Sequence, residues 1–200
     1  MAESTRDRLI NAALDLFSEK GYYATSVDEI AGSIGIKGPN IYKYFKGKQA
    51  LFDAIATEAV AAYTERMGLN TSSDLSRRVR SGSDLKAFTM GQVNFTIYDE
   101  RIHKMRKLLS IEQFKDEGMR NHANFFMYDN MNNLYTKIFV SLIKEGVIKD
   151  ENPNMLALNY TSPISILIQI SDRSPDQREE IIDLIRDHID FFLSNYCIKY

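Results

Sequence analysis

Apolar side chains recur every three or four residues along almost the whole chain, which is the spacing of a helix that buries one face. No run of alternating apolar and polar residues bounded by hairpin turns interrupts this pattern. The 4 prolines stand close to expected helix starts or turns, except Pro163. The periodicity therefore predicts an all-α fold.

Three helices are expected at the N-terminus, because the residues that flank them suit helix ends. The first helix begins after the cap residue Ser4 and ends at Gly21. The second begins in the segment TSVDE at 25–29, which holds two overlapping capping boxes, and it ends at Gly35. The third is expected from Pro39 to Phe45, where proline suits the first turn.

This succession predicts a helix-turn-helix unit, in which a packing helix precedes two short helices joined by a tight turn. Residues 1–47 are expected to form this three-helix DNA-binding domain, with 39–45 as its recognition helix. Residues 48–200 are expected to form a C-terminal helical bundle. One helix of this bundle is expected to begin at residue 48, and the others to cover 84–115 (with a break near 99), 118–145, 153–171 and 175–196. The segment 68–83 is expected to be a loop or a frayed helix.

The chain carries a local excess of positive charge around the expected recognition helix. The whole chain has 25 basic and 27 acidic side chains, and its net charge of −2 excludes a polycation that coats nucleic acid by bulk charge. Between Ile36 and Leu51, however, 4 lysines occur and no acid. Because charges farther away than about 8 Å are screened at physiological salt, DNA would sense this run more than the distant acids.

The residue types in this segment suit the parts of a DNA duplex. Hydroxyl and ammonium groups bind phosphate oxygens, lysine suits guanine acceptors, and asparagine can pair with adenine. Taken singly, each lysine or tyrosine is also explained by a solvated face or by packing, but their coincidence favours DNA binding. Backbone contacts are expected from Thr25, Tyr42, Tyr44, Lys46 and Lys48. Base-edge or close contacts are expected from Lys37, Gly38, Pro39, Asn40 and Lys43.

Residues 6–52 resemble the DNA-binding domain of the TetR family of transcriptional regulators. The resemblance is carried, in order, by AALDLF at 12–17, GY at 21–22, TSVDEIA at 25–31, Gly35, IYKYFKGK at 41–48 and ALF at 50–52. It implies a homodimer on palindromic operator DNA, with phosphates held at Thr25, Tyr42 and Lys48. It also implies a C-terminal domain that binds a small effector. Lys37 stands where the family most often has a small hydroxyl residue, so the operator sequence cannot be inferred from the resemblance.

The last two expected helices are apolar around most of their girth, which requires burial on more than one side. A four-helix interface between two copies of the chain meets that requirement, and a large intramolecular core is the alternative. The interface residues would be Leu156, Tyr160, Ile164, Leu167, Ile181, Ile185, Ile189 and Phe192.

The middle helices are rich in aromatic side chains and methionine, which build either a core or an adaptable apolar pocket. We expect a small apolar or aromatic effector there, although a structural or solvent-facing role is the alternative for His122. The pocket residues would be Phe95, Tyr98, Met105, Phe114, His122, Phe125, Tyr128 and Gln169.

Several other classes of protein are not expected. The 3 histidines stand far apart, and no metal-ligand spacing, phosphate loop or nucleophile elbow occurs, so we expect no metal, no cofactor and no catalysis. The first ten residues lack the apolar core of a signal peptide, and the most apolar stretch, 156–170, is too short to span a bilayer. With the lone Cys197, these features predict a cytoplasmic protein without membrane partners.

The sequence thus predicts a one-component DNA-binding regulator, a repressor that a small effector releases from its operator. An effector-independent regulator and a dimeric protein-interaction adaptor are the alternatives. An enzyme with an appended DNA-binding head would need a catalytic constellation in residues 51–200, where none is visible.

Overall fold

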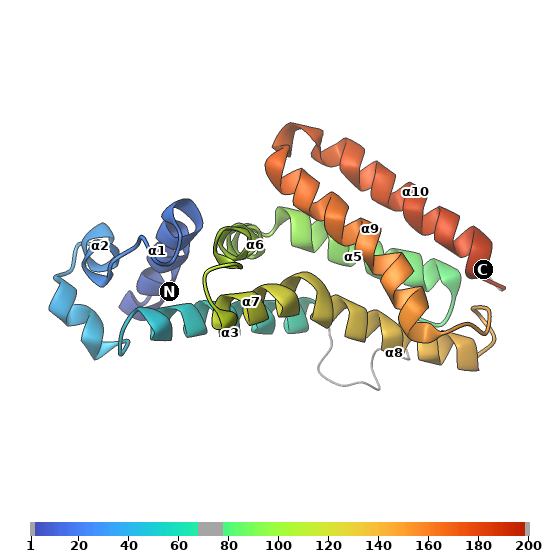
Figure 1. Cartoon of the computed structure of the whole chain (residues 1–200), viewed down its shortest axis with the longest axis horizontal. Helices are drawn as coiled ribbons and strands as arrows, with labels where there is room; N and C mark the ends of the chain where they lie inside the picture. The colour runs from blue at the N-terminus through green and yellow to red at the C-terminus, as the bar shows by residue number, and fades with distance from the viewer. Residues whose placement is uncertain (1–2, 68–77, 199–200) are drawn as a thin grey trace. The chain divides into compact units, whose positions relative to one another are not determined.

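The computed structural model describes residues 3–67 and 78–198, which are almost entirely helical (Figure 1). In chain order the elements are α1 (Thr5–Lys20), α2 (Val27–Ser33), the 3₁₀ helix η1 (Gly38–Lys43), α3 (Lys48–Met67), α5 (Gly82–Tyr98), α6 (Glu100–Glu112), α7 (Glu117–Asn124), the π-helical turn η2 (Phe125–Asp129), α8 (Asn130–Lys144), α9 (Pro153–Arg173), the 3₁₀ turn η3 (Pro175–Gln177) and α10 (Arg178–Tyr196). In these ranges the β-pairing consists of an isolated bridge between Ile148 and Cys197. The all-α prediction is confirmed.

The helix ends follow the signals in the sequence. Ser4 accepts a hydrogen bond from the N–H of Asp7, and Ser26 accepts one from Glu29, as the capping boxes predict. The long helix predicted over 118–145 is present as α7, η2 and α8, with one π turn in its middle. Most of the predicted loop at 68–83 lies outside the described residues.

The chain divides into two compact units, Met1–Tyr63 with Glu100–His122, and Thr64–Asp99 with Ala123–Tyr200. The first unit therefore combines the predicted helix-turn-helix with α6 and most of α7, which the periodicity did not indicate. The functional boundary after residue 47 stays a prediction.

In the first unit α1 packs against α2 and α6, and Leu51 and Phe52 at the start of α3 are buried with them. Phe17 and Phe52 are fully buried, and the ring of Tyr22 lies 5.2 Å from the first and 5.6 Å from the second. These rings fix the turn between α1 and α2, on which the helix-turn-helix depends.

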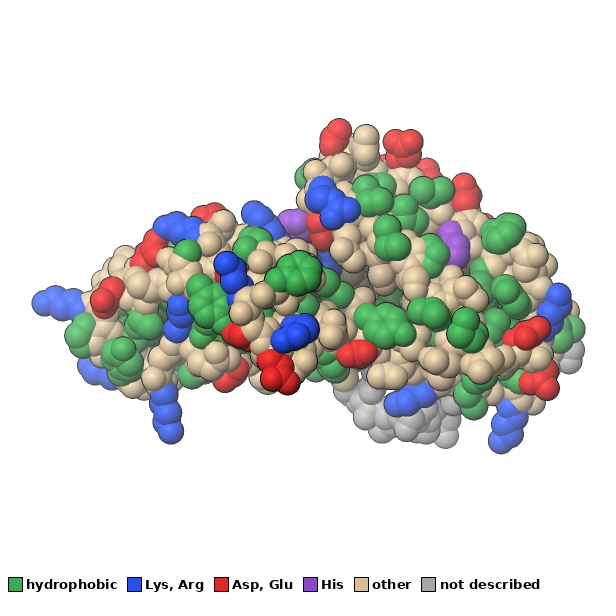
Figure 2. Space-filling view, viewed as in Figure 1, with side chains coloured by type: hydrophobic (Ala, Val, Ile, Leu, Met, Phe, Trp, Pro, Cys, Tyr) green, Lys and Arg blue, Asp and Glu red, His purple; other side chains and the backbone are tan. Residues whose placement is uncertain are grey.

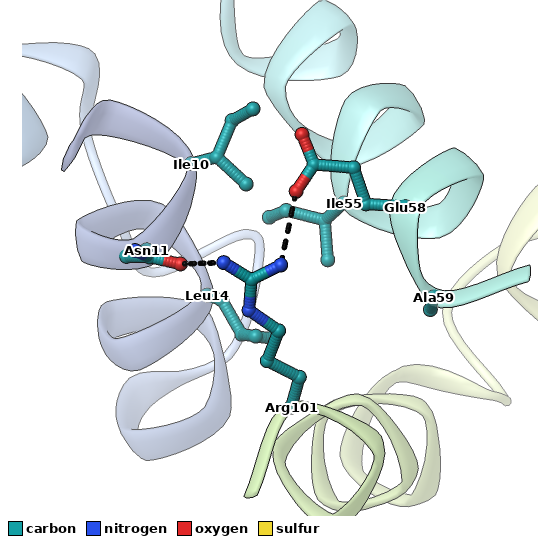
Figure 3. A pocket seen from close by; sticks show the side chains of 7 residues that line it. All are labelled: Ile10, Asn11, Leu14, Ile55, Glu58, Ala59 and Arg101. Carbon is teal, nitrogen blue, oxygen red and sulfur yellow. Dashed lines mark hydrogen bonds and ion pairs between the residues drawn. The ribbon is translucent and has the colours of Figure 1, made fainter. Parts of the chain in front are cut away.

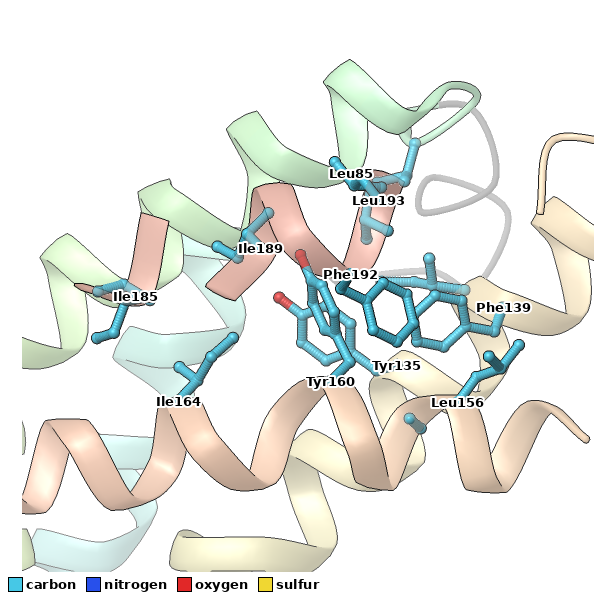
Figure 4. Close-up of a cluster of buried hydrophobic side chains, with 14 of the residues drawn as sticks. Leu85, Tyr135, Phe139, Leu156, Tyr160, Ile164, Ile185, Ile189, Phe192 and Leu193 are labelled. Carbon is cyan, nitrogen blue, oxygen red and sulfur yellow. The ribbon is translucent and has the colours of Figure 1, made fainter. Parts of the chain in front are cut away.

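The second unit is a bundle of α5, α8, α9 and α10 around an aromatic core (Figure 4). The ring of Tyr160 lies 5.2 Å from Tyr135, 5.6 Å from Phe139 and 4.8 Å from Phe192. Large aromatic groups that interlock in this way contribute more than their buried area alone.

The composition of this core corrects the prediction of which residues form a dimer interface. Of the eight predicted interface residues, seven are buried in the core of the chain itself and only Leu167 is not. The seven buried residues are Leu156, Tyr160, Ile164, Ile181, Ile185, Ile189 and Phe192. The periodicity of α9 and α10 indicates that more than one face is apolar. It does not indicate which apolar face turns towards the chain's own core.

None of the helices in the described ranges has the length and apolar composition that a membrane span requires. In the same part of the chain, no group of three or more His, Cys, Asp and Glu side chains is arranged to hold a metal ion.

Candidate nucleic-acid interface

The helix-turn-helix is formed by α2 and η1, which pack against each other. Between them Gly35 adopts a φ of 77°, a left-handed conformation that glycine takes without strain. Ile30 and Ile41 are fully buried and anchor one helix each. The predicted recognition helix is therefore present over Gly38–Lys43, in the tighter 3₁₀ form.

Asp28, which belongs to the predicted capping segment at 25–29, lies against the start of η1. A Cβ atom on Gly38 would overlap the carboxylate of Asp28, which belongs to α2. Glycine at position 38 therefore permits the close approach of the two helices, in addition to any approach to DNA. Sequence spacing gives no cross-helix register, so this contact required the structure.

The predicted DNA-contacting residues from Lys37 to Lys46 lie on the surface of the first unit. The side chain of Tyr42 is 62% exposed and that of Tyr44 is 45% exposed. Lysine and arginine side chains project from the end of this unit that carries α2 and η1 (Figure 2). The exposed group also includes Lys37, Pro39, Lys43 and Lys46, while Gly38 and Asn40 are half-buried.

Thr25 and Lys48 instead face inward. The Thr25 hydroxyl donates to the carbonyl of Gly21 at 2.9 Å, and the residue is 2% exposed. Lys48 Nζ donates to the carbonyls of Tyr22 at 2.7 Å and Thr25 at 3.0 Å, and it lies 4.4 Å from the centre of the Tyr22 ring. Burial lowers the pKa of Lys48, and the charge of Glu112 opposes this shift.

These contacts change the roles expected of the two residues. The hydroxyl of Thr25 is turned away from solvent, so its predicted phosphate contact is corrected to a structural role in the turn between α1 and α2. Lys48 joins the start of α3 to the same turn through two of its three N–H donors.

A carboxylate from α6 holds the other side of this turn. Glu112 is 2% exposed, and its Oε1 accepts from the backbone N–H of Tyr23 at 3.5 Å. Its Oε2 has no hydrogen-bond partner within the described ranges. Gly21, with a φ of 92°, leaves the space that this carboxylate fills, because a Cβ atom there would overlap Glu112 Oε1.

Two basic side chains of α6 tie it to α1 and α3. Arg101 donates to Asn11 at 3.0 Å and to Glu58 at 3.3 Å (Figure 3). Lys104 donates to Asp15 of α1 at 2.7 Å. The partners stand far apart in sequence, so no local spacing could have predicted these ties.

The residues predicted to line an effector pocket are split between the two units. In the first, Met105 is 2% exposed, Phe114 is 89% exposed, and the ring of His122 lies 5.0 Å from that of Phe52. Phe114 projects into solvent and Met105 is packed in the core, so neither lines a pocket within this unit. An abundance of aromatic residues does not indicate which of them share one cavity.

The other five predicted pocket residues belong to the second unit. Tyr98, Phe125 and Tyr128 are 51%, 40% and 44% exposed, and the Tyr98 hydroxyl donates to Glu179. Phe95 and Gln169 are half-buried. Their role in binding an effector stays a prediction.

Comparison with known proteins places the helix-turn-helix in a family. The model of "Bacterial regulatory proteins, tetR family" matches residues 9–55. The Bacillus subtilis protein named "Probable HTH-type transcriptional regulator YttP" is 39% identical over 67 residues, which are 34% of this chain and 32% of that protein. The negative transcriptional regulator IcaR of Staphylococcus aureus is 42% identical over 48 residues, or 24% and 26% of the two chains. The matches thus span about a third or less of these relatives.

A solved structure resembles nearly the whole chain. SmeT, the repressor of the Stenotrophomonas maltophilia multidrug efflux pump SmeDEF, matches with a TM-score of 0.70 and 20% identity over 98% of this chain and 91% of SmeT. Fold and interface together define a protein of the helix-turn-helix class. Its helix-turn-helix segment, residues 9–55, is similar to that of the tetR family of bacterial regulatory proteins.

Proposed function

We propose that this protein is a one-component transcriptional regulator, a repressor that binds a palindromic operator as a homodimer and leaves it when a small effector binds. The observation that carries the proposal is the exposed basic surface formed by Lys43 of η1 with Lys37 and Lys46 on either side of it, within the segment that matches the family. IcaR and SmeT are named as a negative regulator and a repressor. The matched relatives are named as regulators rather than enzymes.

The residues of η1 and those that flank it would divide the work of binding DNA. Lys37, Asn40 and Lys43 offer the groups that bind base edges in the major groove. Tyr42, Tyr44 and Lys46 offer donors for phosphate oxygens and would set the register of the protein on the duplex, with Gly38 and Pro39 in close contact. Thr25 and Lys48 would act through the turn that they hold.

Exposed apolar side chains on α9 and α10 support the homodimer. Ile166, Leu184 and Phe191 are 57%, 52% and 70% exposed, and they line a groove with Pro163 and Leu167. Hydrophobic side chains are visible over this part of the second unit in Figure 2. A contiguous apolar surface of this kind marks an interaction site. A symmetric dimer would place two recognition helices in successive major grooves, about 34–36 Å apart.

Ligand complexes of structural relatives support the effector. SmeT has been solved with triclosan, and FadR of Bacillus subtilis has been solved with stearoyl-CoA. An effector releases DNA only to the extent that it binds the released conformation more tightly than the DNA-bound one. The aromatic bundle of the second unit suits an apolar molecule.

Selection of genomic DNA fragments by the purified full-length protein tests the regulator. We expect enrichment of fragments that share a palindromic site, and loss of that enrichment in Lys43→Ala. Lys149→Ala removes an exposed lysine of the second unit and serves as the matched control. Equal enrichment by both variants would contradict the role given to η1, and no enrichment by the wild type would contradict DNA binding.

Sedimentation tests the dimer separately. Phe191→Glu places a charge in the apolar groove and is expected to give a monomer. Val140→Glu places the same charge at a position that is 51% exposed on α8, outside the groove, and should remain a dimer. A monomeric wild type, or a dimeric Phe191→Glu variant, would contradict this interface.

A further inference from the structure

A small group of polar side chains lies inside the otherwise apolar second unit. Thr89, Gln92, Tyr135 and Tyr160 are fully buried. Thr89 Oγ1 donates to the carbonyl of Leu85 at 2.8 Å and lies 2.9 Å from the Tyr160 hydroxyl. The Tyr135 hydroxyl lies 2.8 Å from Thr89 Oγ1 and 3.0 Å from Gln92 Oε1. Figure 4 shows the two tyrosines side by side in the core.

The amide of Gln92 is the member of this group whose hydrogen-bonding capacity is not used. Its Nε2 has no hydrogen-bond partner among residues 3–67 and 78–198. In this orientation the Tyr135 hydroxyl donates to Oε1, so the atoms left without a partner are the two N–H donors of the amide, and a partner must offer an acceptor. Buried polar groups in proteins are nearly always paired, so an unpaired one calls for a partner, which a ligand or a water molecule can supply.

The surroundings of Gln92 indicate the chemistry of a partner. The buried polar side chains described in the second unit are all uncharged, namely Thr89, Gln92, Asn132, Thr161 and Ser171. Because burying a charge without a counter-charge is costly, a neutral group is favoured over a carboxylate or an amine. The ring of Phe88 lies 6.3 Å from that of Tyr135, and Met131 packs against the same core. An apolar body, preferably aromatic, suits these walls.

The helix that carries Tyr135 has an irregular turn just before it. The π turn η2 directly precedes α8 and packs against α9. Such turns interrupt the regular helical hydrogen bonds and occur frequently at functional sites. This turn gives the wall formed by α8 a place where it can adjust to a ligand.

We infer that Gln92 is the polar recognition group of the effector site. Its amide donates a hydrogen bond to the neutral carbonyl oxygen of an apolar ligand that inserts between α5, α8 and α9. The carbonyl supplies the partner that the amide lacks, and the rings around it contact the apolar body. The regulatory meaning of this site rests on the proposed function, whereas the binding itself does not.

Two compounds that differ only at the relevant atom test the inference. Benzophenone carries a carbonyl where diphenylmethane carries a methylene group. Titration calorimetry with the full-length protein is expected to give benzophenone about tenfold tighter binding, the effect of one hydrogen bond to an otherwise unpaired buried group. In Gln92→Met the two affinities are expected to agree within about twofold. The diphenylmethane affinity should be retained.

Two measurements separate recognition from structural support. The melting temperature of Gln92→Met is expected to equal or exceed that of the wild type, because Tyr135 can still donate to Thr89 and an unpaired amide is removed. Thr89→Val is the matched control: it removes a hydroxyl of the same group, and we expect a lower melting temperature with the preference for benzophenone kept.

Each contrary result would overturn the inference. The inference is wrong if the wild type binds neither compound, if it binds both equally, or if Gln92→Met still prefers benzophenone. A water molecule that satisfies the amide permanently would produce equal binding. Loss of operator selection by the wild type, with the carbonyl preference intact, would overturn the proposed function and leave this site standing.

Discussion

The two compact units of this protein both have apolar cores and differ in the polar contacts that supplement them. The first unit joins α1, α3 and α6 through Arg101, Lys104, Lys48 and the buried carboxylate of Glu112. The second unit joins its helices through interlocking aromatic and aliphatic side chains, which enclose Gln92 and the three polar side chains grouped with it. Both units have apolar cores, but charged side chains also hold the turn that supports the helix-turn-helix, whereas the buried polar side chains of the bundle are uncharged.

The largest expected effect concerns packing in the bundle. Phe192→Ala should lower the free energy of unfolding by about 3–5 kcal/mol, because a buried ring leaves a cavity. Urea denaturation measures this loss, and it should not vary with protein concentration. The adjacent Phe191 is 70% exposed, so Phe191→Ala should act mainly through dimerisation and vary with concentration. Similar, concentration-independent losses in both variants would break the comparison.

The next effect concerns Lys48 in the reading unit. Lys48→Ala removes the ammonium group that binds two carbonyls, and we expect a loss of about 1–2 kcal/mol in the free energy of unfolding. Lys46→Ala should leave stability within about 0.5 kcal/mol, because that side chain is exposed.

DNA binding at several salt concentrations separates the roles of these two lysines. Lys46→Ala should reduce the slope of log affinity against log salt by about 1, as expected for one lost phosphate contact. Lys48→Ala should change the slope less than Lys46→Ala does. An equal change in slope would give Lys48 a direct phosphate contact.

A smaller effect concerns the close contact between α2 and η1. Gly38→Ala should cost about 1 kcal/mol, the low end for overpacking, because the exposed carboxylate of Asp28 has to turn away. Thermal unfolding and DNA affinity measure the cost, and Asp28→Ala in the same chain should relieve it. Gly32→Ala is the control, since no atom lies near its added Cβ. Equal effects of the two alanines would contradict the contact.

The smallest effect is expected at the ion pairs of α6. The Lys104 side chain is 27% exposed, so Lys104→Met should cost about 0.2–1 kcal/mol, and less in 1 M salt. Hydrogen bonds to Asp15 and Glu100 raise the pKa of Lys104, so its contribution is fully present below the pKa of an unfolded lysine and is lost only as pH rises through the higher folded value. Chemical denaturation from about pH 6 to 9 should therefore show a constant difference. Lys107→Met, on the exposed side of α6, is the control.

Much of the reading unit could be predicted because its signals are local. Ser4, Ser26 and Gly35 act on the backbone within a few residues, so they placed the helix ends and the turn correctly. The exposed positions of η1 followed from the same local pattern. The inward positions of Thr25 and Lys48 could not be predicted, since they depend on carbonyls that the turn between α1 and α2 presents.

The bundle shows the limit of such signals more clearly. The sequence determined that α9 and α10 have apolar side chains around most of their girth, because the order of apolar residues along a helix sets which of its faces are apolar. Only the tertiary structure decided that Tyr160 and Phe192 face inward while Ile166 and Phe191 face solvent. The physical reason is that the inward face of a helix is set by the helices packed against it. The sequence alone therefore determines where most helices and the reading motif lie, whereas packing determines the core, the groove and the unpaired amide of Gln92.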